Sequence, residues 1–442
     1  MIGFTLPCET VSLSPRPARI LLRKPGQDSK IADCSAVSNG HNHQDNSVLN
    51  RDLFIRQMRK LRVYVDRDLI RPDLGVHWMV RPLLDTSLAT KCSLQTDPLE
   101  LRPFDRILAE YNRTASEIFE LSDLQDCDVA IVPLNWDEVR GGFSWAAKPD
   151  RELVSAVQKS CLPVTRAGKP LVIFFSESRS HEPVPVPGAV VFRHALYRSR
   201  RTPLDHAMPV MIIADPMQDQ YADLFAQYRH WGAKPTIGFC GFSRDVKISE
   251  TLKTGIYKAY TFLKFGHPDV SQFKGLRLRS KALQVLGQSP IVDANFIIRD
   301  ESVFLTNSKE HFKRREVYRA EFFRNIADSD YQICLRGSAN HSRRPWETLS
   351  CARIPLFIDT DCVLPFESQV DWADYMPIVE EADIGRLPEH VHEFHCRIPP
   401  DLYGDRQRGC RNLWEKWLSP HGFARQFHAN FESLVVTPSR RS

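Results

Sequence analysis

Short, nearly continuous hydrophobic runs alternate with stretches of helical periodicity along most of the chain. Strands that are buried on both faces have such runs, and they occur in parallel sheets. Their alternation with helices predicts a doubly wound α/β domain. In the first half, the strand-like runs lie at 62–65, 128–134, 170–175 and 189–193, and the helical stretches lie at 103–120 and 151–160.

The same alternation starts again after residues 214–235, which have little strand character. Two such series predict two Rossmann-like domains that face each other across a central cleft. The strand-like runs of the second series lie at 236–242, 295–300, 332–335, 355–358 and 377–379, and its helical stretches lie at 275–286 and 309–327.

Domain boundaries follow from these patterns. We expect an N-terminal domain over 51–225 and a C-terminal domain over 226–400. Two further helical patterns predict C-terminal helices and a short tail over 401–442. Residues 1–50 are rich in Ser, Pro, Asn and Asp with little periodicity, which predicts a disordered leader.

Composition and charge restrict the function classes only mildly. The formal net charge of +5 fits an anionic small ligand such as a nucleotide and does not argue for nucleic acid. The 11 cysteines include no CxxC pair, so zinc-site spacing is absent and reduced, cytosolic thiols are favoured. No apolar run approaches the ~20 residues that span a bilayer. We expect a cytoplasmic protein, and contact with a membrane surface stays open.

The most informative segment covers residues 331–372. The run QICL (332–335) leads into a polar loop, and a helix is expected to start near Pro345, because proline is favoured in a first turn. The run PLFI (355–358) then completes a βαβ unit. Ligands of open α/β sheets bind at the carboxyl ends of strands, and a helix start offers free N–H groups to phosphate.

The polar residues of this loop suit a nucleoside diphosphate. Arg343 and Arg344 offer forked donors to a pyrophosphate, and Glu347 can accept two hydrogen bonds from a ribose diol. Ser342 can cap the helix while its backbone faces phosphate. Glu347 could equally complement the helix dipole, and Arg343 could be a solvated loop cation. The predicted donor-binding residues are Arg336, Gly337, Ser342, Arg343, Arg344 and Glu347.

The segment resembles the donor side of the exostosin-like glycosyltransferase family. That family has Ser-x-Arg-x-x-Glu, then Ile/Val-Pro, an apolar strand, an Asp, Leu-Pro-Phe and Asp-Trp. The same elements follow here in the same order over about 40 residues, and residues 127–133 resemble an earlier strand of the family. The family's Gly-x-Asp-His element is replaced by Gly-Lys-Pro at 168–170. The donor-side matches are Ser342, Arg344, Glu347, Ile354-Pro355, Asp359, Leu364-Pro365-Phe366 and Asp371-Trp372.

The resemblance implies a GT-B fold, with the donor in the second domain and the acceptor in the first. It also implies an inverting glycosyltransferase that moves a sugar from a nucleotide-sugar donor to a glycan or glycoconjugate, as in polysaccharide biosynthesis. No cofactor is required beyond the nucleotide-sugar co-substrate. Two alternatives stay open: a nucleotide-sugar epimerase of the same shape, and a degenerate family member that binds sugar without catalysis. The sequence does not indicate the sugar, the base, the acceptor or the oligomeric state.

An inverting transferase needs a base that accepts the proton of the acceptor hydroxyl. Acids just past the strands of the first domain are the candidates, and none stands out. The triplets at 66–68 and 359–361 are Asp-x-Asp pairs, which in other glycosyltransferases hold a divalent ion. Aspartate is also common in turns, and Arg344 already balances a diphosphate, so we predict no metal site. The candidate bases are Asp66, Asp68, Asp137 and Glu138.

Overall fold

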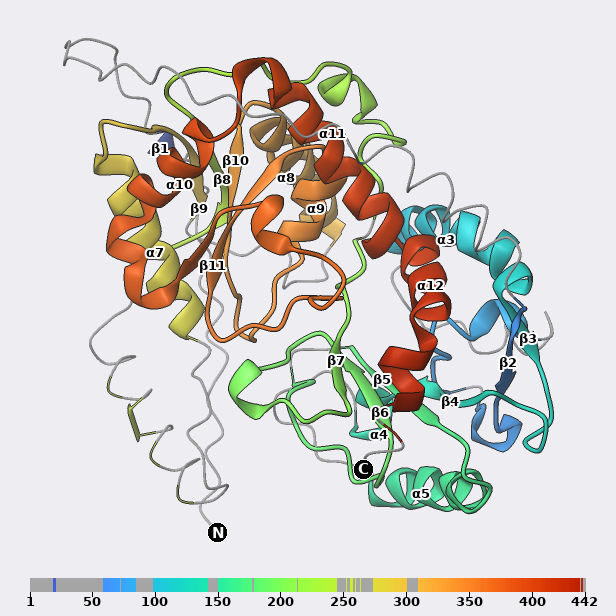
Figure 1. The fold of residues 1–442 in the computed structure, drawn as a ribbon. Coiled ribbons are helices and arrows are strands. Elements are labelled where there is room, and N and C mark those ends of the chain that lie inside the picture. The colour runs from blue at the N-terminus through green and yellow to red at the C-terminus, as the bar shows by residue number, and fades with distance from the viewer. Residues whose placement is uncertain are drawn as a thin grey trace.

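A computed structural model describes residues 19–20, 59–84, 98–141, 150–176, 179–244, 273–299 and 309–437, except 72 and 213, and a few single positions elsewhere. This part of the chain forms two lobes, each built on a six-stranded sheet (Figure 1). The predicted α/β class with two parallel sheets is therefore confirmed. The leader predicted over 1–50 lies outside the described residues, apart from Arg19–Ile20.

The N-terminal lobe has an all-parallel sheet with the strand order β3-β2-β4-β5-β6-β7. Its central strands are apolar on both faces, and β5 (LVIFF) is buried along its whole length. The strands are β2 (Leu61–Tyr64), β3 (Phe119–Leu121), β4 (Val129–Asn135), β5 (Leu171–Phe175), β6 (Val190–Arg193) and β7 (Asp205–Ala207). The helices are α3 (Pro98–Ile118), α4 (Trp136–Val139) and α5 (Arg151–Arg166).

The C-terminal lobe has the strand order β1-β9-β8-β10-β11-β12. Every neighbouring pair is parallel except β1 with β9, so β1 closes one edge as an antiparallel strand. The strands are β1 (Arg19–Ile20), β8 (Thr236–Phe242), β9 (Asp293–Arg299), β10 (Tyr331–Cys334), β11 (Ile354–Asp359) and β12 (Ile378–Glu380). The helices are α7 (Phe273–Gln288), α8 (Lys309–Ala327), α9 (Arg344–Ser350) and α10 (Leu387–Cys396).

The C-terminal helices cross from the second lobe back to the first. Figure 1 shows α11 (Tyr403–Leu413) beside the C-terminal lobe and α12 (Pro420–Ala429) beside α3 of the N-terminal lobe. Phe427 lies 5.5 Å from Phe192 of β6 between ring centroids, so α12 completes the core of the first lobe. The predicted C-terminal helices therefore form, and the second one packs with residues far earlier in the chain. A π-helical turn, η9 (Trp414–Leu418), joins them.

The loops that follow β6 and β11 join the two lobes. Tyr197 forms an isolated antiparallel bridge with Cys362. The backbone N–H of Arg198 donates to the carbonyl of Asp361 at 2.9 Å. Both loops leave the carboxyl ends of parallel strands, so the carboxyl edges of the two sheets meet here.

Three short strands escaped the sequence pattern. Strand β1 lies within the segment 1–50 predicted as a disordered leader, and its two residues pair with β9. The helical stretch predicted over 103–120 ends earlier, because the chain passes from α3 directly into the edge strand β3 at Phe119. Strand β7 has only three residues, Asp-His-Ala, and so contains no apolar run. No helix among the described residues is long and apolar enough to cross a bilayer.

Candidate nucleotide-binding site

The loop between β10 and α9 lies in the middle of the C-terminal sheet, because β10 pairs with β8 on one side and with β11 on the other. The loop closes on itself where the N–H of Gly337 donates to the carbonyl of His341 at 3.2 Å. The first turns of α7 press against it. A Cβ atom added to Gly275 would lie 2.2 Å from the Gly337 oxygen, so only glycine permits this approach.

A cavity of about 240 Å³ opens beside this loop; it is called the loop cavity below. Four of the six predicted donor-binding residues line it, namely Gly337, Ser342, Arg343 and Arg344. The structure adds residues that the sequence reasoning missed, because they come from distant elements. These additional residues are Phe239 of β8, Arg279 of α7, Ile333 of β10, Leu335 and His341.

Arg344 and Arg279 share the ring of Phe239. Their guanidinium carbons lie 4.6 Å and 5.8 Å from its centroid. Arg344 also donates to the carbonyl of Cys240 at 2.9 Å, and Arg279 donates to the carbonyl of Phe242 at 2.6 Å. Burial and the charge of Arg344 lower the pKa of Arg279 to about 10. The two cations therefore repel one another in a poorly solvated place.

Among the described residues, no carboxylate forms an ion pair with Arg279, Arg343 or Arg344. Arg343 is exposed, whereas Arg279 and Arg344 are half-buried, and Nη1 of Arg344 is buried without a hydrogen-bond partner. Buried charges in folded proteins are normally paired, because an unpaired one loses its hydration without compensation. Such an arrangement is typical of a site that receives an anion.

Glu347 lies in the first turn of α9 and is half-buried. Burial raises the pKa of its carboxyl, and the charges of Arg343 and Arg344 partly oppose this rise. In the portion of the chain that the structure describes, its side chain has no hydrogen-bond partner. Glu347 does not line the loop cavity, but its carboxyl interacts electrostatically with Arg343 and Arg344, which do.

Arg336 does not line the loop cavity. Its side chain is buried, donates to the hydroxyl of Tyr197 at 3.2 Å and to Oδ1 of Asn340 at 3.3 Å, and so faces the other lobe. Arg336 and Glu347 are the two predicted donor-binding residues that do not line the loop cavity. Arg336 lines a smaller cavity of about 30 Å³ between the lobes, together with His194, His341 and Ser342.

His194 and His341 face each other across the boundary between the lobes, with ring centroids 5.8 Å apart. His194 follows β6 directly, at the carboxyl edge of the N-terminal sheet. Burial lowers the pKa of His341 to about 4 and takes the pKa of His194 well below its ordinary value. Both rings are therefore neutral at pH 7. The sequence reasoning considered only acids past strand ends and so missed His194.

Two of the four acids predicted as bases, Asp66 and Asp137, form local hydrogen bonds. Asp66 accepts from the N–H of Asp68 at 3.0 Å and from the hydroxyl of Ser160 on α5. Asp137 is buried and accepts from the N–H of Ser176 at 2.8 Å, which fixes the loop after β5. The structure brings none of them together with the loop cavity. Asp68 is exposed, and burial and the charge of Asp73 raise the pKa of Glu138.

The second Asp-x-Asp triplet contributes to the turn and to the contact between lobes. Asp359 accepts from the N–H of Cys362 at 2.7 Å, and Asp361 accepts from the N–H of Ser199 at 3.1 Å. Asp361 has φ 71°, a left-handed conformation that aspartate tolerates better than most residues. The described residues contain no group of three His, Cys, Asp or Glu side chains that could hold a metal ion.

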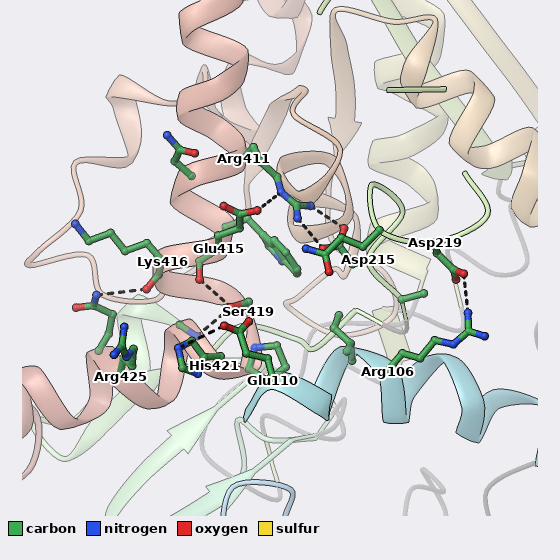
Figure 2. A pocket seen from close by; sticks show the side chains of 18 residues that line it. Arg106, Glu110, Asp215, Asp219, Arg411, Glu415, Lys416, Ser419, His421 and Arg425 are labelled. Atoms are coloured by element: carbon green, nitrogen blue, oxygen red, sulfur yellow. Dashed lines mark hydrogen bonds and ion pairs between the residues drawn. The ribbon is translucent and has the colours of Figure 1, made fainter. Parts of the chain in front are cut away.

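A larger cavity of about 720 Å³ lies elsewhere, between α3, the linker near Asp215 and the C-terminal helices (Figure 2). Several of its charges are paired. Arg411 donates to both oxygens of Asp215 at 2.7 Å and to Glu415 at 2.7 Å, and Arg106 pairs with Asp219 at 2.9 Å. Lys416 and Arg425 also line this cavity and form no ion pair among the described residues. The loop cavity is the better candidate because it lies at the carboxyl edge of a parallel sheet, where ligands of open α/β sheets bind.

Comparisons with known proteins add little to this geometry. No protein-family model and no curated protein matches the chain. Among solved structures, the chain is similar to one described as a co-structure of S. aureus MnaA with UDP. The match has 12% sequence identity and a TM-score of 0.25, and it covers 86% of this chain and 98% of the other.

Proposed function

We propose that the chain binds the diphosphate of a nucleotide sugar in the loop cavity and transfers the sugar to an acceptor, as an inverting, exostosin-like glycosyltransferase of GT-B fold. The cluster of Arg279, Arg343 and Arg344 is the observation that supports this most. It offers three fork-shaped cations that form no ion pair within the described ranges. A diphosphate carries the charge and the oxygen geometry that such a cluster requires.

Each part of the donor has a corresponding group in this arrangement. The phosphates lie against the arginines and the N–H groups of the loop, and the ribose hydroxyls donate to the carboxylate of Glu347. The sugar then points toward the boundary between the lobes, where an acceptor enters from the N-terminal side. The same cations stabilise the diphosphate as negative charge develops on it during bond breaking, which is where electrostatic catalysis acts.

A thermal-shift screen of nucleoside diphosphates and nucleotide sugars tests the binding part. A ligand that binds only the native state raises the melting temperature by mass action, so the correct base should stand out. Release of free nucleoside diphosphate only in the presence of pooled oligosaccharide acceptors supports the transferase. Interconversion of the donor sugar without an acceptor would identify an epimerase. Binding without either reaction would identify a non-catalytic sugar-binding protein.

A further inference from the structure

The N-terminal lobe presents one titratable side chain to the donor loop in a way that suits proton transfer. His194 stands at the carboxyl end of β6 and lines the cavity between the lobes together with Arg336, His341 and Ser342 of the loop. The four acids predicted from the sequence lack this placement. The two described acids that are nearest to His194 in the sequence already form ion pairs. Asp205 pairs with Arg193 at 2.5 Å, and Glu182 pairs with Arg140 at 2.9 Å.

The protonation state of His194 suits a base. Burial takes the pKa of His194 well below its ordinary value, so the ring is neutral at pH 7. A neutral imidazole has one protonated and one unprotonated nitrogen, and the unprotonated nitrogen can accept a proton.

We infer that His194 is the general base of the proposed transfer and removes the proton of the acceptor hydroxyl. The hydroxyl oxygen forms a bond to the anomeric carbon of the donor sugar while the bond from that carbon to the diphosphate oxygen breaks. The proton moves to the unprotonated nitrogen of His194, and the nucleoside diphosphate leaves with the bonding electron pair. The step is balanced without a further reactant. The inference rests on the proposed function.

Donor binding also adjusts this base. Three charged or titratable groups face His194, namely His341 and Arg343 of the loop and His77 of the turn after β2, and each of them lowers its pKa together with burial. A diphosphate bound at Arg343 offsets one positive charge, so it removes one contribution that lowers the pKa of His194, while burial, the largest contribution, remains. Donor binding therefore raises the pKa of His194 relative to the unliganded protein, which is the direction that favours a base.

His206 provides a matched control. It belongs to the same lobe, it has a pKa lowered to about 4 by burial, and it stacks against Phe192 at 5.3 Å. It does not line the loop cavity or the cavity that contains His194. A loss of activity that only reflects a disturbed lobe would affect both histidine variants.

The test measures His194→Gln, His194→Ala and His206→Gln beside the wild type. Calorimetry with UDP and GDP gives the affinity for the nucleoside diphosphate, and its release from the matching nucleotide sugars with pooled oligosaccharides gives turnover. We expect both His194 variants to bind the nucleoside diphosphate like the wild type. We expect them to lose about 10²- to 10⁴-fold in turnover, the usual contribution of a general base. Added imidazole should restore part of the turnover of His194→Ala, and His206→Gln should stay within about threefold of the wild type.

Each outcome decides between the two proposals. Wild-type turnover that persists in His194→Gln, or an equal loss in His206→Gln, would overturn the role of His194 and leave the proposed function standing. A loss in His194→Ala that imidazole does not reduce would show a positioning role in place of a base. Absence of nucleoside diphosphate binding in the wild type would instead refute the proposed function itself. Binding without any turnover would refute the transfer and, with it, the base.

Discussion

Replacement of Arg344 by methionine separates ligand binding from folding. Arg344 donates to the carbonyl of Cys240 and lies over Phe239, but the charge itself has a repulsive neighbour, Arg279, and no ion-pair partner within the described part of the chain. Methionine keeps the flexible stem and its contact with the aromatic ring. The lost hydrogen bond and the relieved repulsion oppose one another, so we expect the free energy of unfolding to change by less than about 1 kcal/mol.

The effect on nucleoside diphosphate binding should be much larger. A hydrogen bond between charged groups contributes about 1.5 to 3 kcal/mol. Because each 1.4 kcal/mol changes an equilibrium constant about tenfold, the dissociation constant should rise about 12- to 150-fold. The poorly solvated position of Arg344 favours the upper part of this range, since charges interact more strongly where water is excluded.

Titration calorimetry and thermal melts of the same samples check both expectations. Arg277→Met is the matched control, because Arg277 is an exposed cation of the same helix as Arg279 and lies outside the loop cavity. It removes the same formal charge and should leave the dissociation constant within about twofold, a difference of only a few tenths of a kcal/mol. Unchanged affinity in Arg344→Met, or an equal loss in Arg277→Met, would refute the assignment of the loop cavity.

Three further predictions follow from the same contacts. Glu347→Gln should weaken binding of the nucleoside diphosphate identified in the thermal-shift screen more than binding of its 2′-deoxy form. Because burial raises the pKa of this carboxyl in the folded state, its stabilising effect is present at low pH and is lost as the pH rises, so the melting temperature of the variant relative to wild type should increase from pH 4 to pH 7. Gly275→Ala should destabilise the fold by about 1 to 3 kcal/mol and weaken nucleoside diphosphate binding, because its Cβ would collide with Gly337. Gly287→Ala, with its nearest atom at 3.7 Å, should be neutral or stabilising in chemical denaturation. The affinity for the nucleoside diphosphate should be the same in EDTA and in Mg²⁺, and a clear dependence on the ion would contradict the turn role of Asp361.

Local sequence patterns predicted the central elements well. Helix α8 has the same bounds as the helical stretch predicted over 309–327. Strand β8 coincides with the run TIGFCGF. These elements are long and have one dominant periodicity, which is the condition under which pattern and structure agree. The failures are short edge strands such as β7, where three residues carry too little hydrophobicity to signal a strand.

The candidate site was predictable only where it is contiguous in the sequence. The loop from Gly337 to Glu347 could be read from its βαβ context, but Arg279 reaches the cavity from a helix almost sixty residues earlier, so no local pattern reports it. Arg336 shows the reverse error. Its position in the loop suggests a phosphate contact, and only the tertiary structure reveals that its guanidinium group faces Tyr197 of the other lobe.

Hydrogen–deuterium exchange with and without saturating nucleoside diphosphate tests the central claim most directly, because it reports both binding and its location. We predict slower exchange in the loop and helix over 336–350 and in the first turns of α7 near Gly275, with little change in α12. Slower exchange confined to the cavity between α3 and the C-terminal helices, or no change with any nucleoside diphosphate, would contradict the assignment of the loop cavity as the donor site.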